Sequence, residues 1–250
     1  MKVTDLYRYP VKGLSPERLD RVDLTAGETV PFDRIYAIEN GPGRFDPMAP
    51  KHLPKINFLM LMRNGALAAL ETVFDVETHT LTVLRDGHQV ARGNLSTSIG
   101  RQLIEQFLAA YLKSELRGPP KITFSEGHSF SDVKQKCLHI VNRASIQELE
   151  RVTGRDIDPL RFRPNVVIEG AAPWEEFNWV DKSLRLGGLT LRVFDRTVRC
   201  AATEVDPTTG QRDLSVPSII SRTWNHTDFG IYAVVDASGS LQVGDDFVVE

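Results

Sequence analysis

Residues 184–200 read Leu-Arg-Leu-Gly-Gly-Leu-Thr-Leu-Arg-Val-Phe-Asp-Arg-Thr-Val-Arg-Cys. The apolar and β-branched residues of this stretch predict two strands, over 184–187 and 189–197. Turn-prone residues follow at Asp206-Pro207-Thr208-Thr209-Gly210. The stretch therefore predicts a β-rich fold in which Cys200 lies just beyond the end of a strand.

The same kind of pattern recurs along most of the chain. Further strands are expected over 2–11, 20–25, 34–39, 57–63, 67–74, 80–85, 88–92, 121–124, 136–141, 164–169, 229–236 and 246–249. Asp86-Gly87 predicts a hairpin turn. The strands outnumber the helices and lack a regular βαβ alternation. This arrangement favours a barrel-like, mostly antiparallel fold with a few covering helices.

Helical periodicity is confined to a few segments, which are about 97–112, about 146–153 and a short turn near 217–223. Ser145 and Glu148 have the spacing of a capping box at the start of the second helix. Gly154 stands where that helix is expected to end.

The chain is expected to divide in the middle. Arg117-Gly118-Pro119-Pro120 breaks regular structure after the first helix, which predicts one domain over 1–115 and another over 116–250. An irregular stretch rich in glycine and proline runs from Asn40 to Pro54. Long loops in compact domains are often functional, so this stretch is a candidate wall of a site.

The composition of the 250 residues is that of an ordinary globular protein, with 41% hydrophobic residues, 25% charged residues and a net charge of -3. A general nucleic-acid-binding protein would usually be basic. No apolar run approaches the roughly 18 residues of a membrane helix, and the start of the chain reads as a strand rather than a signal peptide. The chain contains no P-loop, no GxGxxG and no GxSxG motif. We therefore expect a soluble cytoplasmic protein with no nucleic-acid partner and no membrane partner.

The two cysteines have different surroundings. Two thiols cannot form a disulfide framework, and the six histidines are too scattered to predict a classical zinc site. Cys137 lies inside an apolar strand and is predicted to belong to the core. Cys200 lies at a strand end beside cationic residues, which favours a thiolate and hence a soft ligand for a transition metal. The alternative for Cys200 is a small buried hydrophobe.

Cationic residues before the expected strand 164–169 suggest an anion site. Arg161 and Arg163 flank one phenylalanine, and in a strand both side chains would point to the same face. Guanidinium groups suit phosphate and other planar anions. Lys12 and Arg34 are candidates for the same patch. The alternative is a solvated strand end whose arginines pair with nearby carboxylates.

Taken in order, several motifs resemble those of the MOSC family, and the resemblance covers nearly the whole chain. Tyr9-Pro10-Val11-Lys12 and Asp33-Arg34 are similar to the N-terminal β-barrel domain that accompanies MOSC domains. The motifs that resemble the MOSC domain itself are Arg161-Phe162-Arg163-Pro164-Asn165-Val166-Val167-Ile168, Arg199-Cys200, Thr203-Glu204-Val205-Asp206-Pro207-Thr208-Thr209-Gly210, Phe229-Gly230-Ile231-Tyr232 and Val243-Gly244-Asp245.

The resemblance implies a mainly β (α+β) fold, a MOSC-type β-barrel with an N-terminal β-rich subdomain and a few peripheral helices. Family members with this layout include the mitochondrial amidoxime-reducing component, bacterial proteins that reduce N-hydroxylated compounds and the C-terminal domains of molybdenum-cofactor sulfurases. It therefore implies the molybdenum cofactor (molybdopterin) and an oxidoreductase that acts on N-hydroxylated or related small substrates. Pyridoxal phosphate binding is a further association at the level of the family.

The resemblance also implies roles for individual residues. The cysteine that matches Cys200 ligates molybdenum in the reductases, so Cys200 is the expected metal ligand and catalytic residue. Asp206 is the second catalytic candidate, expected to support the site together with Arg199. The positions that match residues holding the pterin and its phosphate are Lys12, Arg34, Arg163, Asn165 and Arg199. Two cysteines cannot ligate an iron–sulfur cluster, so electrons are expected from a separate donor protein.

The chain departs from the family pattern at three places. Gly43-Arg44-Phe45-Asp46-Pro47-Met48 stands where a threonine–alanine–arginine type of stretch is often found. Thr197 occupies the position of a second cysteine of the reductases, and Val198 replaces a small polar residue. These changes are expected to alter the substrate pocket.

Two other functions are compatible with the same residues. A non-catalytic carrier of the cofactor would use the same cationic patch without an electron donor. A sulfur-transfer protein would carry a persulfide on Cys200 and would depend on an outside desulfurase.

Overall fold

Strands dominate the computed structural model, which describes all 250 residues. The strands are β1 (Lys2–Arg8), β2 (Glu17–Leu19), β3 (Arg21–Leu24), β4 (Tyr36–Asn40), β5 (Glu71–Asp75), β6 (Thr80–Arg85), β7 (His88–Asn94), β8 (Pro120–Phe124), β9 (Leu138–Asn142), β10 (Val166–Glu169), β11 (Ser183–Leu186), β12 (Leu189–Val198), β13 (Asp228–Ala237), β14 (Gly239–Gln242) and β15 (Val248–Val249). The α-helices are α1 (Ser98–Leu112), α2 (Arg143–Thr153) and α3 (Val216–Trp224). Short 3-10 helices are η1 (Lys55–Asn57), η2 (Gly65–Ala69), η3 (Lys113–Glu115), η4 (Pro159–Phe162), η5 (Glu175–Trp179) and η6 (Ala201–Glu204). The predicted mainly β fold class is confirmed.

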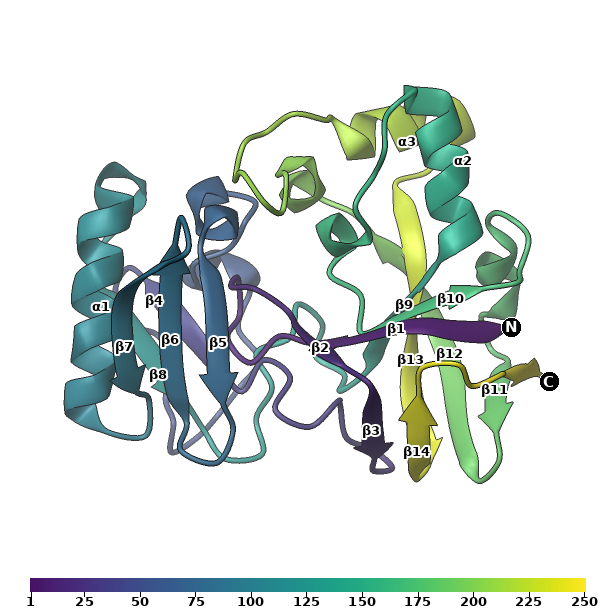
Figure 1. The fold of residues 1–250 in the computed structure, drawn as a ribbon. Coiled ribbons are helices and arrows are strands. Elements are labelled where there is room, and N and C mark those ends of the chain that lie inside the picture. The colour runs from purple at the N-terminus through teal and green to yellow at the C-terminus, as the bar shows by residue number, and fades with distance from the viewer.

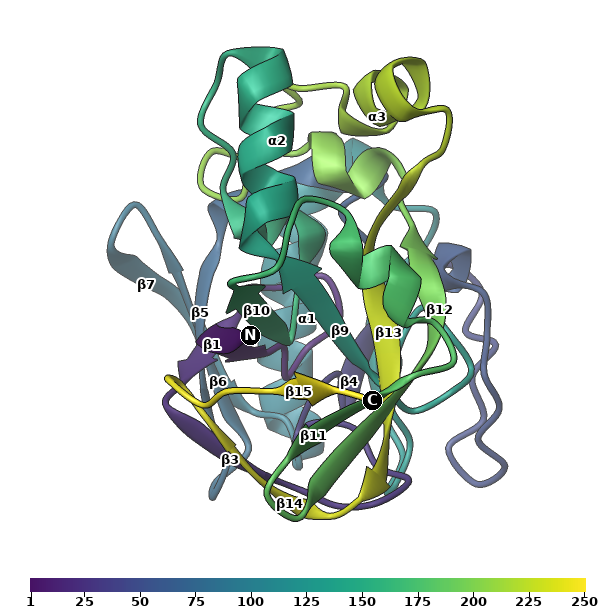
Figure 2. The same cartoon turned by 90° about the vertical axis from the view of Figure 1, so that its right-hand side faces the viewer.

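The elements form two lobes (Figure 1). The large-sheet lobe holds an eight-stranded sheet in the order β15-β11-β12-β13-β9-β10-β1-β2, with α2 and α3 at one end of it (Figure 2). Every pair in this sheet is antiparallel except β9 with β10. The α1 lobe holds the β5-β6-β7 sheet, the β4-β8 pair and α1. The first strand of the chain therefore belongs to the sheet built mainly by the second half.

Each lobe has its own hydrophobic core. The large-sheet core contains 21 buried residues, and alternate residues of β12 such as Leu189, Leu191 and Val193 point into it. The core of the α1 lobe contains 16 buried residues. Ile104 and Leu108 supply the buried stripe of α1 to this second core. No α-helix of the structure combines the length and the apolar character of a membrane-spanning segment.

One of the predicted strands is wrong, and another begins later than predicted. Residues 57–63 contain a buried apolar run, but the chain turns there, because the backbone N–H groups of Arg63 and Asn64 donate to Met60 O. The first half of 67–74 belongs to η2, and only Glu71–Asp75 forms a strand. A short buried apolar run does not by itself distinguish a strand from a packed turn.

The predicted helices are confirmed, but one cap is not. Asn142 caps α2, with its side chain accepting from the Ala144 N–H at 3.1 Å. Ser145 is buried in the first turn and donates instead to the Glu176 carboxylate at 2.8 Å. The capping box of Ser145 and Glu148 is therefore wrong. Gly154 ends α2 in the left-handed conformation, as predicted.

Asp86 and Gly87 form the predicted hairpin turn between β6 and β7. Both residues have positive φ values, 52° and 76°. A two-residue turn of this kind matches the twist of the flanking strands.

Candidate functional site

A cavity of about 290 Å³ is lined by residues of both lobes. The α1 lobe contributes Lys55, Met60, Leu61 and Met62 to its wall, and Cys200 lies in the short segment between β12 and η6. Cationic side chains outnumber carboxylates in the lining. The cations are Lys12, Arg34, Lys55, Arg161, Arg163, Arg196 and Arg199, and the carboxylates are Asp132 and Asp195.

The structure brings most of the predicted site residues together. Lys12, Arg34, Arg163, Asn165, Arg199 and Cys200 all line this cavity, although they are spread over 189 positions of the chain, from 12 to 200. Asp206 does not line it. The five cofactor-binding candidates come from the segments after β1, before β4, after η4 and after β12, so their clustering around Cys200 depends on tertiary packing.

The segment that carries Arg161 and Arg163 is a 3-10 turn rather than a strand. Asp158 caps η4 by accepting from the Leu160 N–H at 2.8 Å, and Pro159 occupies the first turn. Arg163 then ends η4 in the left-handed region, with φ 52°. The expected same-face alternation in a strand is therefore wrong, but both side chains reach the cavity.

The aromatic ring of Tyr9 makes cation–π contacts with two arginines. The guanidinium of Arg163 lies 4.1 Å from the centre of the Tyr9 ring, and that of Arg34 lies 4.7 Å from it. Arg34 also pairs with the buried Asp33. Arg34 has a positive φ of 55°, as Arg163 has. Non-glycine residues in this region of backbone space are uncommon, and such strain is concentrated at functional sites.

Arg163 carries a positive charge that the protein does not neutralise. Its Nη2 atom is buried and has no hydrogen-bond partner. Burial lowers the pKa of Arg163 to about 10, which is still far above neutral pH. A buried charged donor without a partner is costly, so this group fits an anion that enters the cavity.

Arg199 also keeps a buried nitrogen without a hydrogen-bond partner. Its Nη2 donates to Phe162 O at 2.8 Å, but its buried Nε atom has no partner. Burial lowers the pKa of Arg199. His139 lies between the two arginines, with Nε2 at 3.5 Å from Arg199 Nη1 and Nδ1 at 3.4 Å from Arg163 O.

His139 was missed by the sequence prediction because it reads as one polar residue within an apolar strand. It is buried on β9, and burial together with the charge of Arg199 lowers its pKa well below the usual value. His139 is therefore neutral at pH 7, so it adds no repulsion between the arginines.

Lys12 is a buried cation with partners of its own. Its ammonium donates to Phe130 O at 2.8 Å and pairs with Asp132. Burial lowers the pKa of Lys12. Desolvation opposes ionisation of Asp132, but the ammonium of Lys12 holds the pKa of Asp132 far below its usual value. The pair places a fixed cation and a half-exposed carboxylate at the cavity.

Cys200 has a cationic neighbour from the opposite lobe. Lys55 Nζ lies 3.2 Å from Cys200 Sγ and 3.7 Å from Asp132 Oδ2. Lys55 was not predicted, although it directly follows the irregular stretch that ends at Pro54. Cys137 differs, because it is 6% exposed and burial raises the pKa of its thiol to about 12. The prediction that Cys137 is a core residue is confirmed.

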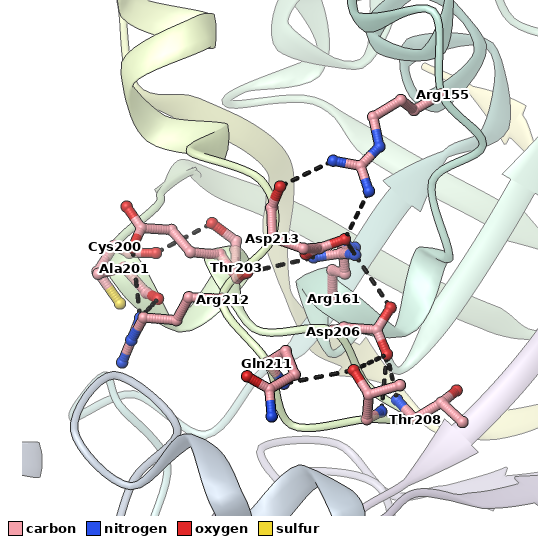
Figure 3. A network of polar contacts seen from close by, with 12 residues as sticks. Arg155, Arg161, Cys200, Ala201, Thr203, Asp206, Thr208, Gln211, Arg212 and Asp213 are labelled. Carbon is pink, nitrogen blue, oxygen red and sulfur yellow. Dashed lines mark hydrogen bonds and ion pairs between the residues drawn. The ribbon is translucent and has the colours of Figure 1, made fainter.

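Asn165 and Asp206 support the cavity without offering free polar atoms to it. The amide of Asn165 donates to Tyr7 O and accepts from the His139 N–H, so it joins β1 to β9. Asp206 accepts from the Thr209 N–H at 2.7 Å and from Arg161 Nη2 at 3.2 Å (Figure 3). Asp206 therefore reaches the cavity only through Arg161.

These features define a class of protein, a β-rich protein whose inter-lobe cavity is lined by fixed cations, by Cys200 and by the buried Cys137. Family models match nearly the whole chain. The MOSC domain model matches residues 121–248, and the MOSC N-terminal beta barrel domain model matches residues 1–115. The chain belongs to the MOSC domain family.

Several named relatives are similar to this chain. Mitochondrial amidoxime reducing component 2 of Rattus norvegicus is 32% identical over 120 residues, which cover 43% of this chain and 35% of that protein. Mitochondrial amidoxime-reducing component 1 of Homo sapiens is 23% identical over 283 residues, which cover 97% and 81%. Molybdenum cofactor sulfurase of Drosophila willistoni is 29% identical over 126 residues, which cover 49% and 16%.

The aligned part of the chain thus spans about a third of the rat protein. The similarities associate the chain with molybdenum-cofactor biochemistry. Among solved structures, the YuaD protein of Bacillus subtilis aligns with 99% of this chain and 94% of its own, at a TM-score of 0.47 and 13% identity.

Proposed function

We propose that the cavity binds the molybdenum cofactor and that the protein is an oxidoreductase for N-hydroxylated or related small substrates. One observation carries the binding part of this proposal. Arg163 Nη2 and Arg199 Nε are buried charged donors without partners, and both residues line the cavity that contains Cys200. The cofactor is anionic, and guanidinium groups suit its phosphate.

Different residues would hold different parts of the cofactor. Arg34, Arg163 and Arg199 would hold the phosphate and the pterin, and the buried Lys12 would add a further cation. Cys200 would ligate the metal, because a thiolate is a soft ligand that suits transition metals. When bound, the cofactor supplies the two-electron redox chemistry of the reaction.

The protein's own contribution is orientation, electrostatics and proton delivery. Reduction of an N-hydroxyl group breaks the N–O bond, and it consumes two electrons and two protons as the oxygen leaves as water. Lys55 Nζ, 3.2 Å from Cys200 Sγ, is a proton-bearing group beside the proposed reaction centre. Electrons would come from a separate donor protein.

Similarity to a molybdenum cofactor sulfurase favours sulfur transfer as a second candidate. In that case Cys200 would receive a sulfane sulfur from an outside desulfurase and pass it on. A non-catalytic carrier would retain the cofactor and release it to another protein. Transfer to an apo-enzyme, without reductase turnover, would identify the carrier.

The first test is the molybdenum and pterin content of the protein from a host that makes the cofactor, with Cys200→Ser beside it. We expect near-stoichiometric molybdenum in the wild type and loss of metal in the variant. A wild-type protein without molybdenum and pterin, from a host that loads another molybdoenzyme, would contradict the proposal. A sulfane-sulfur adduct on Cys200 would then support sulfur transfer.

A further inference from the structure

Cys200 is followed by η6 and then by a closed turn, which is held together by hydrogen bonds between its own backbone groups. The Asp206 N–H donates to Gln211 O at 2.8 Å, and the Gly210 N–H donates to Asp206 O at 3.0 Å. Val205 and Arg212 form an isolated antiparallel bridge at its base. We call residues 205–213 the clamp turn. The Asp213 N–H also donates to Glu204 O at 3.2 Å, so the clamp turn is tied to η6, which directly follows Cys200.

A buried arginine holds the clamp turn to the large-sheet lobe. Arg161 Nη2 donates to Asp213 Oδ2 at 2.9 Å and lies 3.2 Å from Asp206 Oδ2 (Figure 3). On the outer side, Arg155 donates to the same Asp213 carboxylate at 3.0 Å. Asp206 and Asp213, which lie near the two ends of the clamp turn, are therefore both bound by Arg161.

Arg212 reaches from the clamp turn to both sides of the cavity wall. Its Nη1 donates to the carbonyl oxygen of Ala201 at 2.7 Å. Its Nη2 donates to the carbonyl oxygens of Met62 at 2.6 Å and Leu61 at 3.2 Å. Ala201 is the residue after Cys200, whereas Leu61 and Met62 belong to the opposite lobe. All three acceptors therefore come from segments that line or adjoin the cavity.

A second contact brings the same two segments together. An added Cβ at Gly210 would lie 3.0 Å from Gly65 O, and an added Cβ at Gly65 would lie 3.0 Å from Gly210 O. Two glycine backbones thus meet between the clamp turn and η2. This close approach places the clamp turn against the α1 lobe independently of Arg212.

We propose that Arg212 is a positioning residue that ties the turn after Cys200 to the α1 lobe, and so sets the position of the thiol relative to Lys55. The planar guanidinium donates in two directions at once, to Ala201 on one side and to Met62 on the other. A lysine ammonium is a single point on a flexible stem and does not reproduce this fork. The role does not depend on which group the cavity binds.

The test is the rate at which iodoacetamide alkylates Cys200 in the cofactor-free full chain, well below the unfolding temperature. Arg212→Ala and Arg212→Lys should both react faster than the wild type. The expected increase is about tenfold, because Cys200 is only partly exposed and local opening uncovers its thiol further when one or two hydrogen bonds are lost. Peptide mapping assigns the label to Cys200 rather than to the buried Cys137.

Arg192→Ala is the matched control, because Arg192 pairs with Asp236 away from the cavity. It should react at the wild-type rate. If Arg212→Lys also reacts at the wild-type rate, the charge alone suffices and the proposal is overturned. A lower melting temperature for Arg212→Ala with an unchanged alkylation rate would likewise overturn it, since Arg212 would then contribute only to stability. Because no cofactor is needed, failure here is distinct from failure of the metal-binding proposal.

Discussion

At the scale of single residues, the site contains more buried positive charge than its neighbouring carboxylates neutralise. Arg34 and Lys12 have carboxylate partners, whereas Arg163 and Arg199 each keep a buried nitrogen without one. Removing one partner of a buried charge is strongly destabilising, so such atoms are rare in proteins without a ligand. The uncompensated arginines are therefore the residues on which anion binding should depend most.

Arg163→Gln should weaken cofactor retention more than Arg161→Gln. Both arginines keep one buried nitrogen without a partner, but the charge of Arg161 is already paired with Asp206 and Asp213, whereas Arg163 has no carboxylate partner. Loss of a charge-assisted hydrogen bond corresponds to about 1.5–3 kcal/mol, or roughly 10- to 150-fold in affinity. Pterin content after dialysis of the two variants checks this. Equal retention in both would contradict the assigned role of Arg163.

His139 should make stability depend on pH. Its pKa is lowered in the folded protein by burial, while the unfolded chain titrates near the ordinary value of about 6.5. Below that value the unfolded state binds the proton that the folded state excludes. The contribution is therefore fully present above about pH 6.5 and is lost as the pH falls further, by up to about 1.4 kcal/mol per pH unit.

Urea unfolding of the wild type and His139→Gln at pH 7.5 and pH 5.5 measures this effect. The wild type should lose more stability between the two values than the variant does. His88→Gln, which alters an exposed histidine on β7, is the control and should behave as the wild type. An identical pH slope for His139→Gln and the wild type would exclude the buried neutral imidazole.

At the scale of elements, β13 approaches the site closely because of one glycine. Gly230 has φ +79°, and an added Cβ would lie 2.5 Å from Ile140 O and 2.7 Å from His139 Nε2. The close approach lets β13 pair with β9 while His139 remains packed beside Phe229 O. Here the backbone conformation of a strand determines where a side chain of the cavity lies.

Gly230→Ala should destabilise the protein by about 2–4 kcal/mol, from the positive φ together with the steric overlap. Thermal unfolding measures this loss. Gly127→Ala is a useful comparison, because Gly127 also has a positive φ of 68° but no atom within 4 Å of an added Cβ. Gly127→Ala should lose only the part of the stability that comes from the positive φ. Equal losses in the two variants would contradict the close-packing argument.

At the scale of the whole molecule, the large sheet contains strands from both sides of the domain boundary predicted at 115/116. β1 pairs with β10, and β3 pairs with β14, so strands of the first segment complete structures of the second. Conversely, β4 of the first segment pairs with β8 of the second. Cavity residues also come from both segments, so the site depends on the complete chain.

A fragment comprising residues 116–250 should therefore not fold to a native state on its own. It lacks β1 and β2, and the exposed edge of β10 would favour aggregation. Co-expression with the fragment 1–115 should restore a folded complex. Circular dichroism and cooperative unfolding of the isolated 116–250 fragment are the measurements, and a cooperative transition of native size would contradict this prediction.

The sequence by itself determined the β-rich class, most strand positions, the three helices and the main cationic residues of the cavity together with Cys200. These follow from local periodicity, turn residues and motif order, which act over short distances along the chain. The tertiary structure alone decided that Arg161 and Arg163 lie on a 3-10 turn, and that Lys55, Asp132 and His139 face Cys200 and the arginines. Contacts such as those of Arg212 with Ala201 and Met62 join positions far apart in the chain, and no local pattern encodes which distant backbone carbonyls a guanidinium will meet.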